Sequence, residues 1–133
     1  MKRIIICLAF TAFLCMIGVN AKLKIEVTKE VECKRKTQNG DHLRIHYTGT
    51  FPDGKEFDSS MKRGPPFTFK IGVGNVIKGW DQGLLGMCEG EKRRLTIPPE
   101  LAYGDKGFDT LIPPGSTIIF DTELLKIEMH EEL

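Results

Sequence analysis

Residues 76–86 read VIKGWDQGLLG, and this stretch decides which fold class the sequence can adopt. Ile77, Trp80 and Leu84 recur at positions i, i+3 and i+7, which is the spacing of one apolar helical face. A helix is therefore predicted over residues 76–85, the only stretch with this period. Because it is short and contains two glycines that each cost about 1 kcal/mol relative to alanine, it needs another element to pack against.

The two glycines, Gly79 and Gly83, lie four residues apart and so share one face of the predicted helix. A face without side chains lets the backbone of a neighbouring element come close. Gly86 is placed to end the helix. One helix laid in this way against a strongly twisted sheet is an α+β fold.

The remaining segments alternate between apolar and polar residues, as strands with one buried face do. About five strands are predicted, within residues 25–31, 43–47, 67–71, 93–97 and 117–128. Such a pattern is typical of an antiparallel sheet with one solvated face. The charged run Lys92-Arg93-Arg94 is interpreted as a solvated strand end.

Two proline pairs, Pro98-Pro99 and Pro113-Pro114, bracket a region that contains Tyr103, Gly104 and Gly107. Proline pairs and glycines argue against a strand in this region. We expect an ordered loop that forms one wall of a pocket near the helix.

Residues 1–21 are predicted to be a signal peptide that is removed. Two basic residues precede an apolar run from Ile4 to Val19, which is shorter than the about 20 residues of a membrane-spanning helix. The small Ala21 fits a cleavage position. Residues 22–133 are then long enough for one core, so a single domain without a membrane span is expected.

The charge balance disfavours two classes of partner. The chain has 19 basic and 18 acidic residues, and loss of Lys2 and Arg3 with the leader leaves 17 basic residues and a net charge of −1. Such a balance gives no electrostatic reason to expect binding to nucleic acid or to an anionic membrane.

No motif indicates a cofactor, a metal ion or a covalent reaction. Gly72-Val73-Gly74 lacks the third glycine and the Lys-Ser/Thr of nucleotide-binding loops. His42 and His46, four apart on a strand, are too distant to share a metal ion. The pair Ser59-Ser60 is interpreted as a polar turn and not as a hydrolytic site.

Two of the four cysteines, Cys33 and Cys88, remain after removal of the leader. In an oxidising compartment two such thiols indicate one disulfide bridge, worth about 4 kcal/mol in the chain-entropy model. Two separate buried thiols are the alternative. A Cys-x-x-Cys motif is absent, which disfavours a redox-active pair.

The last four residues, His130-Glu131-Glu132-Leu133, resemble the tetrapeptides that a receptor reads to retrieve proteins to the endoplasmic reticulum. Behind a signal peptide, this end predicts a protein of the endoplasmic reticulum lumen. The alternative is an ordinary acidic tail.

Five short motifs then follow in order along the mature chain: His46-Tyr47-Thr48-Gly49, Gly54 to Ser60, Val76 to Trp80, Tyr103-Gly104 and Ile112 to Asp121. With their separations they resemble the FKBP immunophilins, and within this family the small members of the endoplasmic reticulum lumen. The resemblance implies an antiparallel sheet wrapped around the single helix, with an aromatic cavity between them.

The resemblance also implies roles for individual residues. Trp80 would form the cavity floor, while the backbone N–H of Ile77 and the hydroxyl of Tyr103 would hold carbonyl groups of the substrate. The implied catalytic residues are Tyr47, Asp58, Ile77, Trp80, Tyr103 and Phe120. The implied binding residues for substrate or macrolide are Tyr47, Phe57, Asp58, Arg63, Phe67, Val76, Ile77, Trp80, Tyr103, Phe108, Leu111, Ile112 and Phe120.

Structural interpretations of some of these residues stay open. Trp80 could serve only the core, where its N–H would need a partner. Asp58 could cap a turn, although an acid among so many apolar neighbours needs paired hydrogen bonds. Asn75 and Phe108 differ from the residues common in the family, which bears on ligand preference at the rim.

The function implied by the resemblance is peptidyl-prolyl cis/trans isomerisation, without cofactor or metal, during protein folding in the secretory pathway. Expected partners are proline-containing polypeptides, macrolides such as FK506 and rapamycin, and the retrieval receptor; a monomer is expected. One alternative is a non-catalytic module that holds proline segments in the same cavity. Another is a thiol-disulfide exchanger, which would need a reactive thiol.

Overall fold

The computed structural model describes residues 22–128, so the predicted leader over residues 1–21 and the tetrapeptide at residues 130–133 lie outside the described residues. The elements in chain order are β1 (Lys24–Lys29), β2 (His42–Thr50), β3 (Glu56–Ser59), α1 (Ser60–Arg63), β4 (Phe67–Lys70), α2 (Lys78–Gly83), β5 (Lys92–Ile97), the 3-10 helix η2 (Pro99–Leu101) and β6 (Ile118–Glu128). None of the helices within residues 22–128 has the length and apolar character to cross a membrane.

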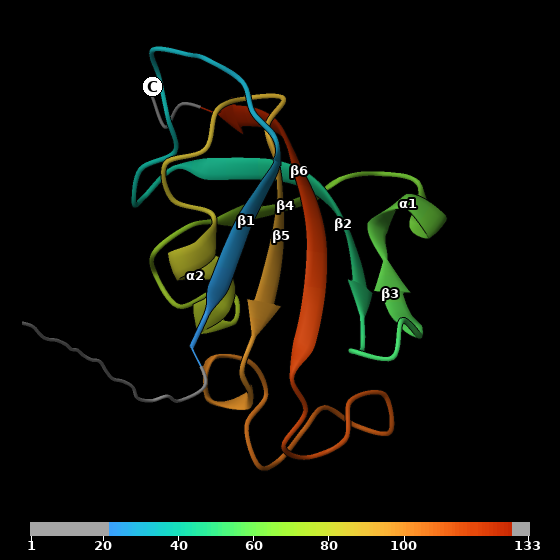
Figure 1. The fold of residues 1–133 in the computed structure, drawn as a ribbon. Helices are drawn as coiled ribbons and strands as arrows, with labels where there is room; N and C mark the ends of the chain where they lie inside the picture. The colour runs from blue at the N-terminus through green and yellow to red at the C-terminus, as the bar shows by residue number, and fades with distance from the viewer. Residues whose placement is uncertain (1–21, 129–133) are drawn as a thin grey trace, which may run out of the picture.

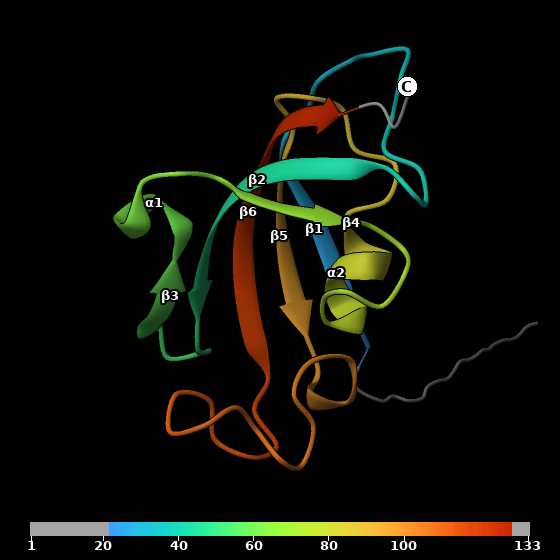
Figure 2. The same ribbon diagram turned by 180° about the vertical axis from the view of Figure 1, so that it is seen from behind.

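The strands form one antiparallel sheet in the order β1-β5-β6-β2-β3, and β4 pairs with the first half of β2 beside this path. Figure 1 and its reverse view in Figure 2 show the sheet curving around α2, which lies on one side of it. The predicted α+β class and antiparallel sheet are confirmed, and β3 adds a sixth strand to the five that the sequence predicted.

Four elements differ from the sequence-based expectation. Helix α2 is shorter than predicted, because Ile77 is still extended at φ −59° and ψ 151° and Leu84 already leaves the helix. Val31 lies outside β1, which ends at Lys29 after a register shift. The single turns α1 and η2 were not predicted, because a turn of three or four residues is too short to show a hydrophobic period.

The glycine face of α2 packs directly on β5. A Cβ atom placed on Gly79 would lie 2.6 Å from Cγ2 of Ile97, and one on Gly83 would lie 2.9 Å from Cδ1 of Leu95. Both β5 side chains are fully buried. The glycine face does allow close packing, but the groups that come close are side chains of β5, where a neighbouring backbone was expected.

A buried ion pair holds the end of α2. Arg93 donates from Nε to Glu91 at 2.7 Å, and its guanidinium also donates to the carbonyl oxygens of Gly83, Leu85 and Gly86 at 2.8–3.1 Å. The side chains of Arg93 and Glu91 are only 11% and 7% exposed. The interpretation of Arg93 as part of a solvated strand end is therefore wrong, because its buried guanidinium donates to the carbonyl of Gly83, the last residue of α2, and to two carbonyls of the turn that follows.

A disulfide between Cys33 and Cys88 joins the segment before β2 to the turn after α2, with 5.8 Å between the Cα atoms. The predicted bridge is confirmed, and the alternative of two separate thiols is wrong. Thr37 strengthens this connection, since its hydroxyl donates to Leu84 O at 2.6 Å and accepts from the Met87 N–H at 2.9 Å. The thiol-disulfide exchanger would require a free thiol, and Cys33 and Cys88 provide none.

Replacing Gly79 by alanine tests the contact between α2 and β5. In the wild-type background, overpacking against Ile97 costs about 1–3 kcal/mol and outweighs the helix-propensity gain of about 1 kcal/mol, so the free energy of unfolding should fall. In an Ile97→Ala background the same substitution should raise it, because the contact is gone. Denaturant unfolding measures both effects, with the exposed Gln82→Ala in α2 as the control. A stabilising Gly79→Ala in the wild type would contradict the packing.

Candidate functional site

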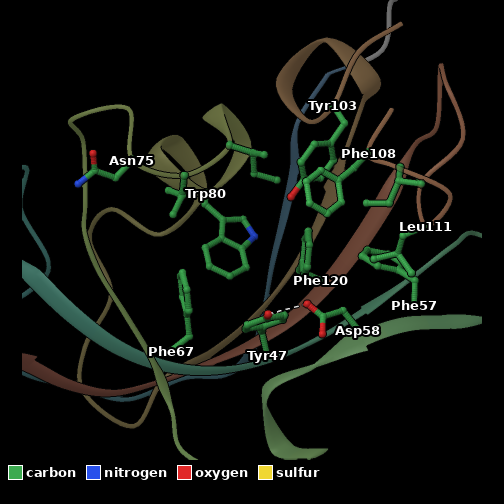
Figure 3. Close-up of a pocket in the computed structure, with 13 residues that line it drawn as sticks. Tyr47, Phe57, Asp58, Phe67, Asn75, Trp80, Tyr103, Phe108, Leu111 and Phe120 are labelled. Carbon is green, nitrogen blue, oxygen red and sulfur yellow. Dashed lines mark hydrogen bonds between the residues drawn. The ribbon is translucent and has the colours of Figure 1, made fainter. Parts of the chain in front are cut away.

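A cavity of about 300 Å³ opens between α2, the sheet and the loop before β6. Figure 3 shows its labelled side chains converging from strands, helix and loops on one hollow. The lining residues are Tyr47, Phe57, Asp58, Phe67, Asn75, Val76, Ile77, Trp80, Tyr103, Phe108, Leu111, Ile112 and Phe120.

Trp80 lies at the bottom of this cavity, and four aromatic rings surround it. Its ring centroid is 5.1 Å from those of Tyr47 and Phe120, both in edge-to-face geometry. Phe69 and Phe67 follow at 5.5 and 5.8 Å. Such edge-to-face contacts are favourable beyond their buried area, so the floor is held rigidly.

The indole N–H of Trp80 is buried and finds no hydrogen-bond partner among residues 22–128. A Trp that only fills a core normally has a partner for this group. The location of Trp80 beneath an open cavity therefore fits the floor better than the core alternative.

One corner of the cavity is polar. The Tyr47 hydroxyl donates to Oδ2 of Asp58 at 2.7 Å, and Arg63 donates to Oδ1 of Asp58 and to the Tyr47 hydroxyl, both at 2.6 Å. Helix α1 supplies Arg63 five residues after Asp58 in β3. The Asp58 carboxylate thus has two side-chain donors, which argues against the turn-capping alternative.

This hydrogen bonding keeps the corner ionised. Burial would raise the pKa of the Asp58 carboxyl, but hydrogen bonds from Tyr47 and Arg63, with the Arg63 charge, outweigh burial and lower that pKa below its ordinary value. Burial and the hydrogen bond to Asp58 raise the pKa of the Tyr47 phenol. Asp58 is therefore a carboxylate, and Tyr47 a neutral donor, near neutral pH.

The loop after β5 forms the opposite wall. Tyr103 packs against Phe108 with 5.4 Å between ring centroids, and its hydroxyl points into the hollow in Figure 3. Burial, followed by the charge of Asp58, raises the pKa of Tyr103, so this hydroxyl stays a donor. Phe108 and Leu111 are 47% and 42% exposed and extend the apolar wall outward to the rim.

Two backbone features fix this wall. Phe108 and Ile112 exchange hydrogen bonds at 2.8 and 3.0 Å, which closes the loop into a tight turn. Gly107 precedes this turn at φ +68°, and a Cβ there would lie 2.2 Å from the Ile112 carbonyl oxygen. No residue with a side chain fits this position without moving the wall.

The third wall is the segment that enters α2. The carbonyl of Ile77 accepts hydrogen bonds from the N–H groups of Trp80 and Asp81 at 3.0 and 3.2 Å. The Ile77 N–H itself has no acceptor in the described part of the chain. Together with the Tyr103 hydroxyl, this N–H gives the apolar cavity two donors for a ligand.

The structure brings together nearly all of the predicted site residues. Arg63 is the exception, because it does not line the cavity and reaches it only through Asp58 and Tyr47. Asn75 lines the cavity but was predicted only for the rim.

Sequence reasoning missed Ser60, whose fully buried hydroxyl accepts from the Tyr47 N–H at 2.8 Å and lies 2.9 Å from Nδ1 of His46. The run Asp58-Ser59-Ser60 was its only sequence signal. Within residues 22–128, no cluster of three or more His, Cys, Asp or Glu could hold a metal ion.

Comparisons with known proteins agree with this geometry. A family model described as FKBP-type peptidyl-prolyl cis-trans isomerase matches residues 33–125. The mouse protein named peptidyl-prolyl cis-trans isomerase FKBP2 is 58% identical over 113 residues, covering 84% of this chain and 81% of the relative. The human protein of the same name is 54% identical over 129 residues, or 96% and 91% of the two chains.

Two further matches extend the comparison. FK506-binding protein 2 of Emericella nidulans is 61% identical over 109 residues, which cover 81% of this chain and 80% of the relative. The crystal structure of AtFKBP13 superposes with a TM-score of 0.73 at 44% identity, covering 80% of this chain and 93% of that one.

Titration of Asp58 tests the polar corner. Its pKa, followed by carboxyl NMR, should lie below the ordinary value of about 3.9 and should rise in Tyr47→Phe and in Arg63→Met. Since the folded-state pKa is depressed, ionised Asp58 stabilises the fold above the ordinary carboxyl pKa, and this contribution is lost as the pH falls through the folded-state pKa. The stability difference between wild type and Asp58→Asn should shrink over that range. An Asp58 pKa that Tyr47→Phe and Arg63→Met leave unchanged would refute the network.

Proposed function

Because this chain belongs to the family of FKBP-type peptidyl-prolyl cis-trans isomerases, we propose that it accelerates rotation of Xaa-Pro bonds in polypeptides that fold in the secretory pathway. The observation that supports this most directly is the aromatic cavity with its ionised corner and its two unused donors. A proline ring and the preceding peptide bond would occupy this hollow.

The reaction requires no bond to be broken. Rotation of a peptide bond crosses about 18–20 kcal/mol because resonance holds it planar, and a thousandfold acceleration requires about 4 kcal/mol. The twisted amide has less charge separation than the planar form, so apolar walls favour it. Trp80 and Phe120 would supply these walls without any nucleophile.

The polar groups would hold the substrate in the reactive orientation. The Ile77 N–H and the Tyr103 hydroxyl would each donate to a substrate carbonyl, so that rotation occurs about a fixed axis. Asp58 would keep the corner in one geometry, because Tyr47 and Arg63 already fix its two oxygens. These donors and the carboxylate are oriented before the substrate arrives.

We also propose that the same cavity binds macrolides. Relatives with 54–61% identity carry the printed name FK506-binding protein 2, and the rim residues Phe67, Phe108 and Leu111 expose apolar surface around the mouth. FK506 or rapamycin would fill the cavity in place of a proline segment and inhibit isomerisation.

A location in the endoplasmic reticulum lumen is proposed from the sequence of residues 1–21 and 130–133. The disulfide between Cys33 and Cys88 supports an oxidising compartment. The mature chain would then be residues 22–133, acting as a monomer on folding clients.

A peptide isomerisation assay with and without rapamycin tests the function. Wild-type protein should accelerate the cis-to-trans conversion, and rapamycin should abolish the acceleration; binding of proline peptides without acceleration would support the non-catalytic module instead. Trp80→Ala, Phe120→Ala and Asp58→Val should each lower kcat/KM by about tenfold or more, equivalent to about 1.4 kcal/mol of transition-state binding. Val27→Ala, exposed on β1 and outside the cavity, is the control. Full activity in all three variants would remove the site assignment.

Removal of residues 130–133 tests the location. Expressed in cells with its leader, the complete chain should stay inside, whereas the truncated chain should appear in the medium because the receptor no longer reads its end. Immunoblots of cells and medium give the distribution. Equal secretion of both forms would refute retrieval.

A further inference from the structure

The loop between β4 and α2 carries part of the cavity wall but has little backbone support of its own. It runs from Ile71 to Ile77 and includes Asn75 and Val76, which line the cavity. At its start, Ile71 exchanges hydrogen bonds with Gly40 and Asp41 at 2.8 and 2.9 Å. At its end, the Ile77 carbonyl accepts the first hydrogen bonds of α2, from the N–H groups of Trp80 and Asp81. Between these anchors, no backbone-to-backbone hydrogen bond of residues 72–76 occurs in the described part of the chain.

One carboxylate provides the missing support. Oδ1 of Asp81 accepts the N–H of Gly72 at 2.8 Å, and Oδ2 accepts the N–H of Gly74 at 2.9 Å. Both glycines have positive φ angles, +85° and +80°. This conformation turns the two N–H groups toward one anion, as in a backbone anion-binding nest. The nest is filled by the protein's own side chain, so the Gly72-Val73-Gly74 motif serves an internal carboxylate.

Asp81 follows Trp80 directly on α2, although it does not line the cavity itself. Its carboxylate therefore ties the loop that carries Asn75 and Val76 to the helix that carries the floor. Hydrogen bonds to an ionised acceptor are shorter and stronger than those between neutral groups, so this connection fixes the distance between wall and floor. Figure 3 shows Asn75 and Trp80 on these two parts of the site.

We propose that Asp81 is a positioning residue for isomerisation, which holds the loop over residues 72–76 so that Val76 and the Ile77 N–H meet the substrate in the reactive geometry. This inference rests on the proposed function, because it assigns those two groups to substrate binding. Displacement of a positioning group by about 1 Å can cost on the order of a hundredfold in rate. The effect of losing one hydrogen bond of the clamp should be smaller but measurable.

Asp81→Asn tests the two hydrogen bonds most directly. It keeps the shape of the side chain but replaces one acceptor oxygen by an NH2 group, which cannot accept a hydrogen bond from a glycine N–H. We expect kcat/KM for a proline peptide to fall about tenfold, and the NMR coupling across one of the two glycine hydrogen bonds to disappear. Asp81→Glu, which retains both oxygens, should recover part of the activity. Gln82→Ala in the same helix and Glu32→Gln, which removes a charge at an exposed position, should behave like wild type.

Two measurements separate positioning from general stability. Wild-type protein should show couplings from the Gly72 and Gly74 nitrogens to the Asp81 carboxyl carbon, a result that needs no variant to fold; their absence would overturn the proposal. In Asp81→Asn, the amide signals of Tyr47 and Leu95 in the sheet should stay in place while those of Gly72 and Gly74 move. An active wild type with an equally active Asp81→Asn would overturn the inference alone. An inactive wild type would overturn the proposed function as well.

Discussion

The contact between the glycine face of α2 and strand β5 sets the geometry on which the rest of the structure depends. Because Gly79 and Gly83 have no side chains, Ile97 and Leu95 reach the helix backbone, and Trp80 lies at a fixed height above the sheet. Its ring then meets the rings of Tyr47 and Phe120 edge to face. A helix with ordinary side chains on that face would stand farther from the sheet, and the cavity floor would move with it.

The cavity combines two environments that oppose each other physically. In the proposed mechanism, apolar walls would favour the less polar, twisted amide, but a carboxylate in such surroundings is costly unless it is paired. Tyr47 and Arg63 resolve this conflict for Asp58 by donating to both of its oxygens. Asp81 shows the same arrangement behind the wall, where two backbone N–H groups fix both carboxylate oxygens. Charge is thus used to fix loops and corners, and the centre of the cavity stays apolar.

The sequence pattern was informative wherever a residue's role depends on its neighbours along the chain. The period of Ile77, Trp80 and Leu84 predicted the helix. The order of short motifs indicated the family, and the resemblance to that family implied that the aromatic residues share one cavity. It failed for Arg93, whose charge suggested a solvated position. Only the packed structure places that guanidinium at the end of α2, where it donates to the last helix carbonyl and to two carbonyls of the following turn.

By itself, the sequence determined the fold class from its periodicity and one candidate disulfide pair from its cysteine count, and its resemblance to a family implied which residues line the cavity. Only the tertiary structure decided that Arg63 lies outside the cavity and donates to the Tyr47 hydroxyl, and that the Ser60 hydroxyl accepts from the Tyr47 N–H. It also decided that the Asp81 carboxylate accepts the N–H groups of Gly72 and Gly74. Each of these contacts joins residues from different elements at distances near 3 Å. The angles at which strands, helix and loops meet set such distances, and no local pattern along the chain encodes those angles.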